Sequence, residues 1–79
     1  MAHEFTLEQI APEMEYATVT RWHKREGDTV AAGELIVELE VEKANYEVEA
    51  PVSGVVAAIL AVEGDELKVG QTLAVIEEA

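Results

Sequence analysis

The sequence has no cysteine, which excludes disulfide bridges, thiolate metal ligands and a redox dithiol. Basic residues are also scarce, because five Lys and Arg stand against 17 Asp and Glu, for a formal net charge of −12. This charge would repel nucleic acid and anionic membranes. No apolar run approaches the ~20 residues needed to cross a bilayer, and no secretory signal opens the chain. We therefore expect neither nucleic acid nor a membrane as a partner.

The chain is also short. At 79 residues a protein buries only roughly 60% of its unfolded surface, so we expect a single domain over residues 1–79 with one modest core and no deep substrate cleft. Catalytic groups are few, since Ser53 is the only serine and the two histidines, His3 and His23, are far apart in sequence. The glutamates lack the glycine-punctuated spacing of a calcium loop. The sequence predicts no catalytic residues and no metal site.

An internal repeat organises what is present. When the sequence is placed on itself at a shift of 37, the recurring residues are Val19, Glu26, Gly27, Asp28, Gly33 and Glu40, which match Val56, Glu63, Gly64, Asp65, Gly70 and Glu77. Apolar positions also fall on apolar positions at this shift. A shift of 39 places Glu8 on Glu47 and the Ala-Pro pair at 11–12 on the pair at 50–51, which predicts a two-residue insertion downstream of that pair.

Short runs of β-branched and aromatic residues favour strands, because Gly-Asp or Pro interrupts them at intervals too close for ordinary helices. The expected strands lie near Phe5–Gln9, Ala17–His23, Leu35–Val41, Asn45–Glu49, Val55–Leu60 and Leu73–Glu77, with short strands around Val30 and Leu67. Two amphipathic copies can cover each other's apolar faces. The predicted fold is therefore all-β, a flattened barrel or sandwich of two four-stranded antiparallel sheets related by an approximate two-fold axis.

The two halves meet at a predicted hairpin. From 37 to 42 apolar residues alternate with glutamates, and from 45 to 49 polar residues alternate with Tyr46 and Val48, so one face of each strand is buried. Residues 42–44 form the tip. The two-fold axis that relates the halves places the two chain ends at the position equivalent to this hairpin. Lys43 and the termini are thus expected at opposite ends of the domain.

Lys43 stands out within this hairpin. It is the only cation between Glu34 and Glu49, a stretch that holds six glutamates, and the whole chain has only three lysines. A solvated turn lysine that offsets carboxylate repulsion is one interpretation, and a point of attachment is another. Position and charge by themselves leave both open.

The run Glu38-Leu39-Glu40-Val41-Glu42-Lys43-Ala44 resembles the lipoylation motif of lipoyl domains, typically Glu-Val/Ile-Glu-Thr-Asp-Lys-Ala, in the acyltransferase components of 2-oxo acid dehydrogenase complexes. The resemblance extends over residues 5–77, through Trp22, Lys24, Gly27-Asp28, Gly33, Ala50-Pro51, Gly54, Gly64-Asp65 and Val69-Gly70. The chain departs from the family in having Val41 for Thr, Glu42 for Asp, and Tyr16 where a small or polar residue is commoner. The segment around Tyr16 lies near the modified lysine in the family.

The resemblance implies a non-catalytic carrier in which lipoic acid is joined to Lys43 as an amide by a lipoate ligase or lipoyl transferase. The arm would carry acyl groups between a thiamine-diphosphate-dependent decarboxylase, an acyltransferase core and dihydrolipoamide dehydrogenase. Glu38, Glu40, Glu42, Ala44 and Glu47 are the candidates for the surface that the ligase and decarboxylase recognise. The resemblance further implies a monomeric domain in the bacterial cytoplasm or the mitochondrial matrix.

Two other functions stay open at this point. Biotinyl carrier domains have a similar fold, but their lysine usually lies between two methionines, whereas Lys43 lies between Glu42 and Ala44. An unmodified interaction module, such as the lipoyl-like domain of membrane-fusion adaptors, is usually split by a helical hairpin. No helical period interrupts this chain.

Overall fold

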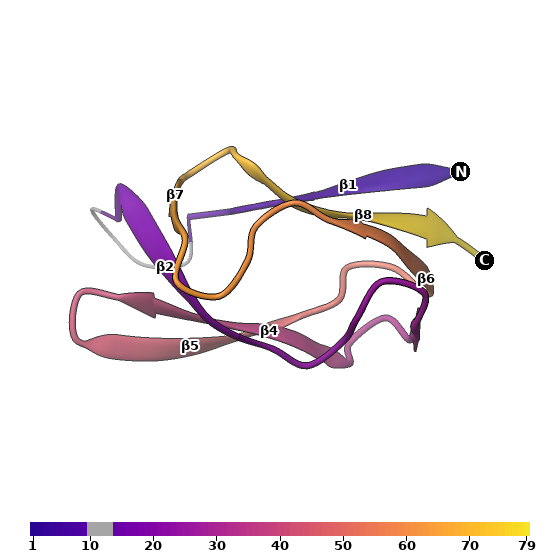
Figure 1. Ribbon diagram of the computed structural model, residues 1–79, viewed down its shortest axis with the longest axis horizontal. Helices are drawn as coiled ribbons and strands as arrows, with labels where there is room; N and C mark the ends of the chain where they lie inside the picture. The colour runs from indigo at the N-terminus through magenta and orange to yellow at the C-terminus, as the bar shows by residue number, and fades with distance from the viewer. Residues whose placement is uncertain (10–13) are drawn as a thin grey trace.

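The computed structural model describes residues 1–9 and 14–79, and its regular elements are eight strands. They are β1 (Ala2–Thr6), β2 (Tyr16–Trp22), β3 (Thr29–Val30), β4 (Leu35–Val41), β5 (Ala44–Glu49), β6 (Gly54–Ile59), β7 (Glu66–Lys68) and β8 (Thr72–Glu78). They form two four-stranded antiparallel sheets, ordered β1-β8-β6-β3 and β5-β4-β2-β7, which pack as a flattened sandwich (Figure 1). The predicted all-β fold is confirmed.

The predicted strands agree with the structure except at the N-terminus. The first strand was expected near Phe5–Gln9, but β1 runs from Ala2 to Thr6. Its early start is explained by pairing with β8, since Ala2 lies opposite Glu77 and the Glu78 N–H donates to the Met1 carbonyl at 2.8 Å. The first residues of β1 are therefore in a strand because they pair with β8. Their own side chains, which are not a run of apolar residues, do not predict this.

The 37-residue repeat corresponds to a structural two-fold relation. The bounds of β4, 35–41, shifted by 37, are those of β8, 72–78. The two sheet orders are equivalent under the same exchange, because β5, β4, β2 and β7 occupy the places of β1, β8, β6 and β3. Each half therefore supplies strands to both sheets, and neither half forms a sheet alone.

The repeated Glu-Gly-Asp turns fasten the two halves to each other. The Gly27 N–H donates to the Val56 carbonyl at 2.7 Å, and the Gly64 N–H donates to the Val19 carbonyl at 2.7 Å. Both glycines have positive φ, 94° and 95°, a backbone conformation that glycine adopts without steric cost. Each turn is therefore hydrogen-bonded to a strand of the opposite half.

The glutamates of these turns act in the same crossed manner. The carboxylate of Glu26 accepts the Ile59 N–H at 2.8 Å, and that of Glu63 accepts the Trp22 N–H at 3.3 Å. Trp22 and Ile59, which coincide at a shift of 37, thus make matching hydrogen bonds. Trp22 itself is half-buried against the core, and its indole N–H donates to the Ala61 carbonyl at 2.7 Å.

The 39-residue alignment of the upstream segments is wrong. Leu7 donates to the Gln71 carbonyl and accepts from Gly70, while Ala50 donates to the Glu34 carbonyl and accepts from Gly33. Since 34 and 33 become 71 and 70 at a shift of 37, Leu7 corresponds to Ala50, a shift of 43. The insertion is therefore six residues (43 minus 37) rather than two. The Ala-Pro pair at 11–12, on which the alignment depended, lies outside the described residues.

One hydrophobic cluster lies between the sheets. The largest side chains fully buried in it are Ile36, Leu39, Leu73, Ile76, Val19, Val37 and Val56. The alternation predicted from Val37 is confirmed, since Leu39 and Val41 are buried beside it. Ile36 is buried as well because a register shift at 35–37 breaks the strict alternation.

The two ends of the domain are different in kind. The molecule is 34 Å long, with the β4–β5 hairpin at one end and both chain termini at the other (Figure 1). The termini lie side by side because β1 pairs with β8, and the Met1 ammonium lies 3.0 Å from a Glu77 carboxylate oxygen. The predicted separation of Lys43 from the chain ends is confirmed.

Candidate functional site: the β4–β5 hairpin

The β4–β5 hairpin ends in a two-residue loop. Val41 lies opposite Ala44 in the register, so Glu42 and Lys43 make the connection. Behind the loop the paired strands continue without interruption to Val37 and Val48. Val41 is buried, whereas the four residues that follow it, 42–45, are all exposed. The base of the hairpin is thus fixed in the core while its tip projects into solvent.

Glu42 has an unusual backbone conformation. Its φ is 58°, and it is the only non-glycine residue in the described chain with positive φ. Two-residue hairpin loops favour turns with positive φ at the first central position, because these match the twist of the strands. A residue with a Cβ carries a free-energy cost of ~1–2 kcal/mol in this region. The direction in which Lys43 leaves the hairpin therefore depends on a strained neighbour.

The Lys43 side chain is exposed at this tip, as the sequence indicated. Within the described residues its ammonium group makes no salt bridge, whereas Lys24 is paired with Glu34 at 2.9 Å. An amine that is accessible, unpaired and held on a rigid turn fits a covalent attachment point. It is poorly suited to act as an acid or base on a small substrate, because the tip has no enclosing walls.

The five candidate recognition residues do not form one continuous face. Glu38 and Glu47 lie opposite each other in the register, and Glu40 lies opposite Asn45, all on the outward face of the hairpin. Ala44 alternates with these residues and lies on the other face, exposed only because it is at the tip. The predicted set is therefore divided between the two faces of the hairpin and its loop.

Glu38 differs from the other glutamates of the set. It is half-buried, and its carboxylate lies 2.5 Å from His23 Nε2. Its backbone carbonyl also accepts the Thr20 hydroxyl at 3.0 Å. A carboxylate engaged in this way is less available to an incoming enzyme than the exposed Glu40, Glu42 and Glu47. The pairing with His23 was not foreseen, since it depends on the β2–β4 register.

The structure adds a shallow cavity of about 390 Å³ beside the tip. It is lined by Met14, Glu15, Tyr16, Thr18, Glu40, Val41, Glu42 and Glu66. The sequence had singled out Tyr16, and the structure places this half-exposed ring next to the hairpin. Glu66 was missed because it comes from β7, whose pairing of Glu66 with Thr18 brings the C-terminal half to the site.

Ionisation is perturbed elsewhere in the domain. The pKa of the Glu34 carboxyl is lowered from 4.5 because the Ala31 N–H donates a hydrogen bond to it and the Lys24 ammonium lies beside it.

Among the described residues there is no helix long and apolar enough to cross a membrane. Within the same part of the chain, no three acidic or histidine side chains are grouped closely enough to hold a metal ion.

Comparison with known proteins identifies the class of domain. A family model named Biotin_lipoyl, described as "Biotin-requiring enzyme", matches residues 3–76. The chain belongs to this family.

The individual relatives place it more closely. It is 43% identical over 75 residues to the dihydrolipoyllysine-residue succinyltransferase component of the 2-oxoglutarate dehydrogenase complex of Staphylococcus saprophyticus. It is 40% identical over 80 residues to the dihydrolipoyllysine-residue acetyltransferase component of the pyruvate dehydrogenase complex of Zymomonas mobilis. These matches cover 95% and 100% of the chain but only 18% of each relative.

A solved structure supports the same placement. The lipoyl domain of the 2-oxoglutarate dehydrogenase complex from Azotobacter vinelandii superimposes with a TM-score of 0.79 at 36% identity, covering 98% of this chain and 99% of that domain. The chain is therefore a lipoyl-type domain, a small carrier unit that is not an enzyme by itself. The predicted family membership is confirmed.

Proposed function

We propose that Lys43 carries lipoate and that the domain is the swinging-arm carrier of a 2-oxo acid dehydrogenase complex. The observation that carries this proposal is the exposed, unpaired Lys43 amine on the two-residue loop, at the end of the domain remote from the termini. When bound, the dithiolane supplies a carrier for acyl groups moving between a thiamine-diphosphate-dependent decarboxylase, an acyltransferase core and dihydrolipoamide dehydrogenase. The residues of the domain itself would present the amine and contact the partner enzymes.

The hairpin would present the amine to a lipoate ligase or lipoyl transferase. The Lys43 nitrogen would attack the carbonyl carbon of an activated lipoyl donor, and the C–N bond would form as the bond from that carbon to the donor's leaving group breaks. The nitrogen must first lose a proton because an ammonium group has no lone pair. Among the described residues, no carboxylate or imidazole forms a salt bridge with the Lys43 ammonium and could take its proton. The modifying enzyme would therefore accept that proton, and the domain would contribute orientation and access.

The shape of the domain suits transport between active sites. A tether at the terminal end leaves the opposite end free to enter a partner, and tethering by short flexible linkers raises effective concentrations to the millimolar range. The net charge of −12 would repel other copies of the domain and steer it toward basic entrances. Salt should weaken such steering. A complex of this kind would be found in the bacterial cytoplasm or the mitochondrial matrix.

Lipoate is favoured over biotin for two reasons. The residues on either side of Lys43 are Glu42 and Ala44, and neither methionine of the chain lies beside it. The relatives named above are dihydrolipoyllysine-residue acyltransferases, and the similar solved structure is named a lipoyl domain. The unmodified module remains the alternative if no enzyme attaches a group.

The attachment is tested by incubating the purified domain with lipoate ligase, lipoate and ATP and measuring the intact mass. We expect one lipoyl adduct on the wild-type domain and none on Lys43→Ala. The matched control is Lys68→Ala, which removes another exposed lysine and should be modified at the wild-type rate. A parallel reaction with biotin ligase should give no adduct. Continued lipoylation of Lys43→Ala would refute the site, and biotinylation at Lys43 would favour the alternative cofactor.

The recognition surface is tested separately. Charge reversal of the exposed Glu40 or Glu47 should raise the KM for the domain in reductive acylation by its decarboxylase, whereas reversal of the His23-paired Glu38 should change KM less. Equal effects at all three positions would show that net charge alone is sensed. Comparing several decarboxylases in this assay would identify the 2-oxo acid.

A further inference from the structure

The sandwich has one flank where its sheets are not closed. Each sheet has a long outer strand, β1 with five residues or β5 with six, and a short one, β3 with two or β7 with three. Within residues 1–9 and 14–79, β1 pairs only with β8, and β5 pairs only with β4. Every second residue of an edge strand directs its N–H and C=O outward without a partner. β1 and β5 border the same side of the molecule, so this flank carries two free edges.

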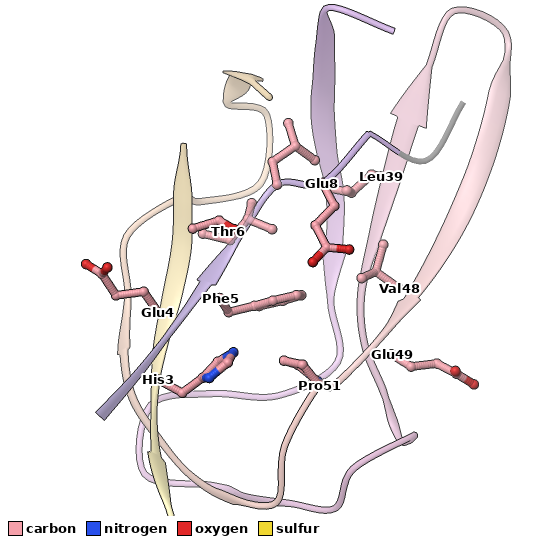
Figure 2. A pocket seen from close by; sticks show the side chains of 11 residues that line it. His3, Glu4, Phe5, Thr6, Glu8, Leu39, Val48, Glu49 and Pro51 are labelled. Atoms are coloured by element: carbon pink, nitrogen blue, oxygen red, sulfur yellow. The ribbon is translucent and has the colours of Figure 1, made fainter. Parts of the chain in front are cut away.

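An apolar slot opens between these edges. It encloses about 250 Å³, and its floor is formed by Phe5, Leu39 and Leu73, each at most 6% exposed. Figure 2 shows the Phe5 ring directed into the space, with Pro51 and Val48 across from it. An apolar cavity of about 150 Å³ accepts benzene in other proteins. The slot can therefore take one aromatic or large aliphatic side chain.

The rim of the slot is acidic. Its lining includes Glu4, Glu8 and Glu49 together with one histidine, His3, and no lysine or arginine is present among the described lining residues. In Figure 2 the Glu8 carboxylate lies over the slot, while Glu4 and Glu49 point away from it on either side. An extended polypeptide that paired with the free edge of β1 would thus have carboxylates near the side chains on both of its faces.

We propose that this flank is a docking groove for an extended, Lys- or Arg-rich segment of a partner polypeptide. The segment adds as a fifth strand to the free edge of β1 and inserts one apolar side chain into the slot. Backbone pairing supplies affinity in this mode of recognition, and the pocket supplies specificity. Charge complementarity selects a basic segment, because its cations lie next to Glu4, Glu8 and Glu49.

The same charges argue against a second copy of the domain as occupant. A copy would bring its own acidic edge against this one, with a net charge of −12 on each molecule. The groove is also separate from the hairpin tip, since none of its lining residues belongs to 42–44. A partner held there leaves Lys43 exposed, so the inference does not rest on the function proposed for that lysine.

The test uses the 15N-labelled domain of 79 residues and a capped peptide, Lys-Thr-Lys-Phe-Lys-Thr-Lys, followed by amide chemical shifts. We expect saturable shifts on β1 and at Val48 and Glu49. Replacing the peptide's Phe by Ala should weaken binding by about tenfold or more, as expected for a buried aromatic side chain. A peptide with Pro in place of both Thr residues keeps the charge and the Phe but lacks two N–H donors, and it should also bind more weakly.

Variants of the domain complete the test. The double change Glu4→Lys and Glu49→Lys should weaken peptide binding by about tenfold or more, since two charge contacts become repulsive. Glu66→Lys, an exposed change on the short edge strand β7, should bind as the wild type does. Shifts centred on 40–45, equal binding of the Pro peptide, no saturable shift at millimolar peptide, or shifts that grow with domain concentration alone would each overturn the proposal.

Discussion

The left-handed conformation of Glu42 leads to a quantitative prediction. Glutamate at φ 58° carries a cost of ~1–2 kcal/mol, while asparagine tolerates this region because its short side chain can hydrogen-bond locally. Glu42→Asn should recover about half of the cost, or about 0.5–1 kcal/mol. For a domain of this size that change raises Tm by roughly 2–8 °C.

The assay is thermal or urea unfolding followed by the fluorescence of Trp22, the single tryptophan of the chain. Trp22 is a suitable probe because it is half-buried against the core and its indole N–H is bonded to Ala61. The matched control is Glu40→Asn, which removes the same charge from the same hairpin at an ordinary strand position. Asparagine is disfavoured in strands, so this control should not gain stability.

The comparison separates two explanations. If both variants are stabilised equally, the gain comes from reduced repulsion between glutamates, and the backbone argument is wrong. If Glu42→Asn is no more stable than the wild type, the turn does not store the expected strain. A gain confined to position 42 would show that the residue before Lys43 was kept despite its cost, as expected where strain occurs at a functional position.

Three further predictions concern the rest of the fold. Gly54→Ala should lower stability by about 1–3 kcal/mol or more, because an added Cβ would lie 2.0 Å from the Glu77 carbonyl oxygen; normal urea unfolding would contradict this close approach. Gly27→Val should also destabilise, but through its φ of 94° rather than through a clash, so Gly27→Asn should be milder in the same assay. The lowered pKa of Glu34 means that its contribution to stability is complete above pH 4.5 and is lost as pH falls through the folded-state pKa; the stability difference between wild type and Glu34→Gln should shrink on acidification, and a constant difference would contradict the pairing with Lys24.

Much of the fold could be predicted because the chain repeats itself. Recurrence of Glu-Gly-Asp at a shift of 37 indicated two equivalent halves, and period-two alternation indicated strands with one buried face. The same signals failed upstream. At a shift of 39 residue identity matched the wrong positions, whereas the hydrogen bonds of Leu7 and Ala50 show a shift of 43. Backbone pairing does not depend on side-chain identity, so a divergent segment conceals its register.

The sequence by itself determined the exposed lysine. A strand of alternating glutamates, a tight turn and a second alternating strand place Lys43 at a tip whatever the rest of the chain does, because hairpin geometry is local. Only the tertiary structure decided what surrounds that tip. Glu66 reaches it through the β2–β7 pairing, and His23 engages Glu38 through the β2–β4 pairing. The slot between β1 and β5 likewise exists only when both sheets are assembled, since its walls come from strands about forty residues apart.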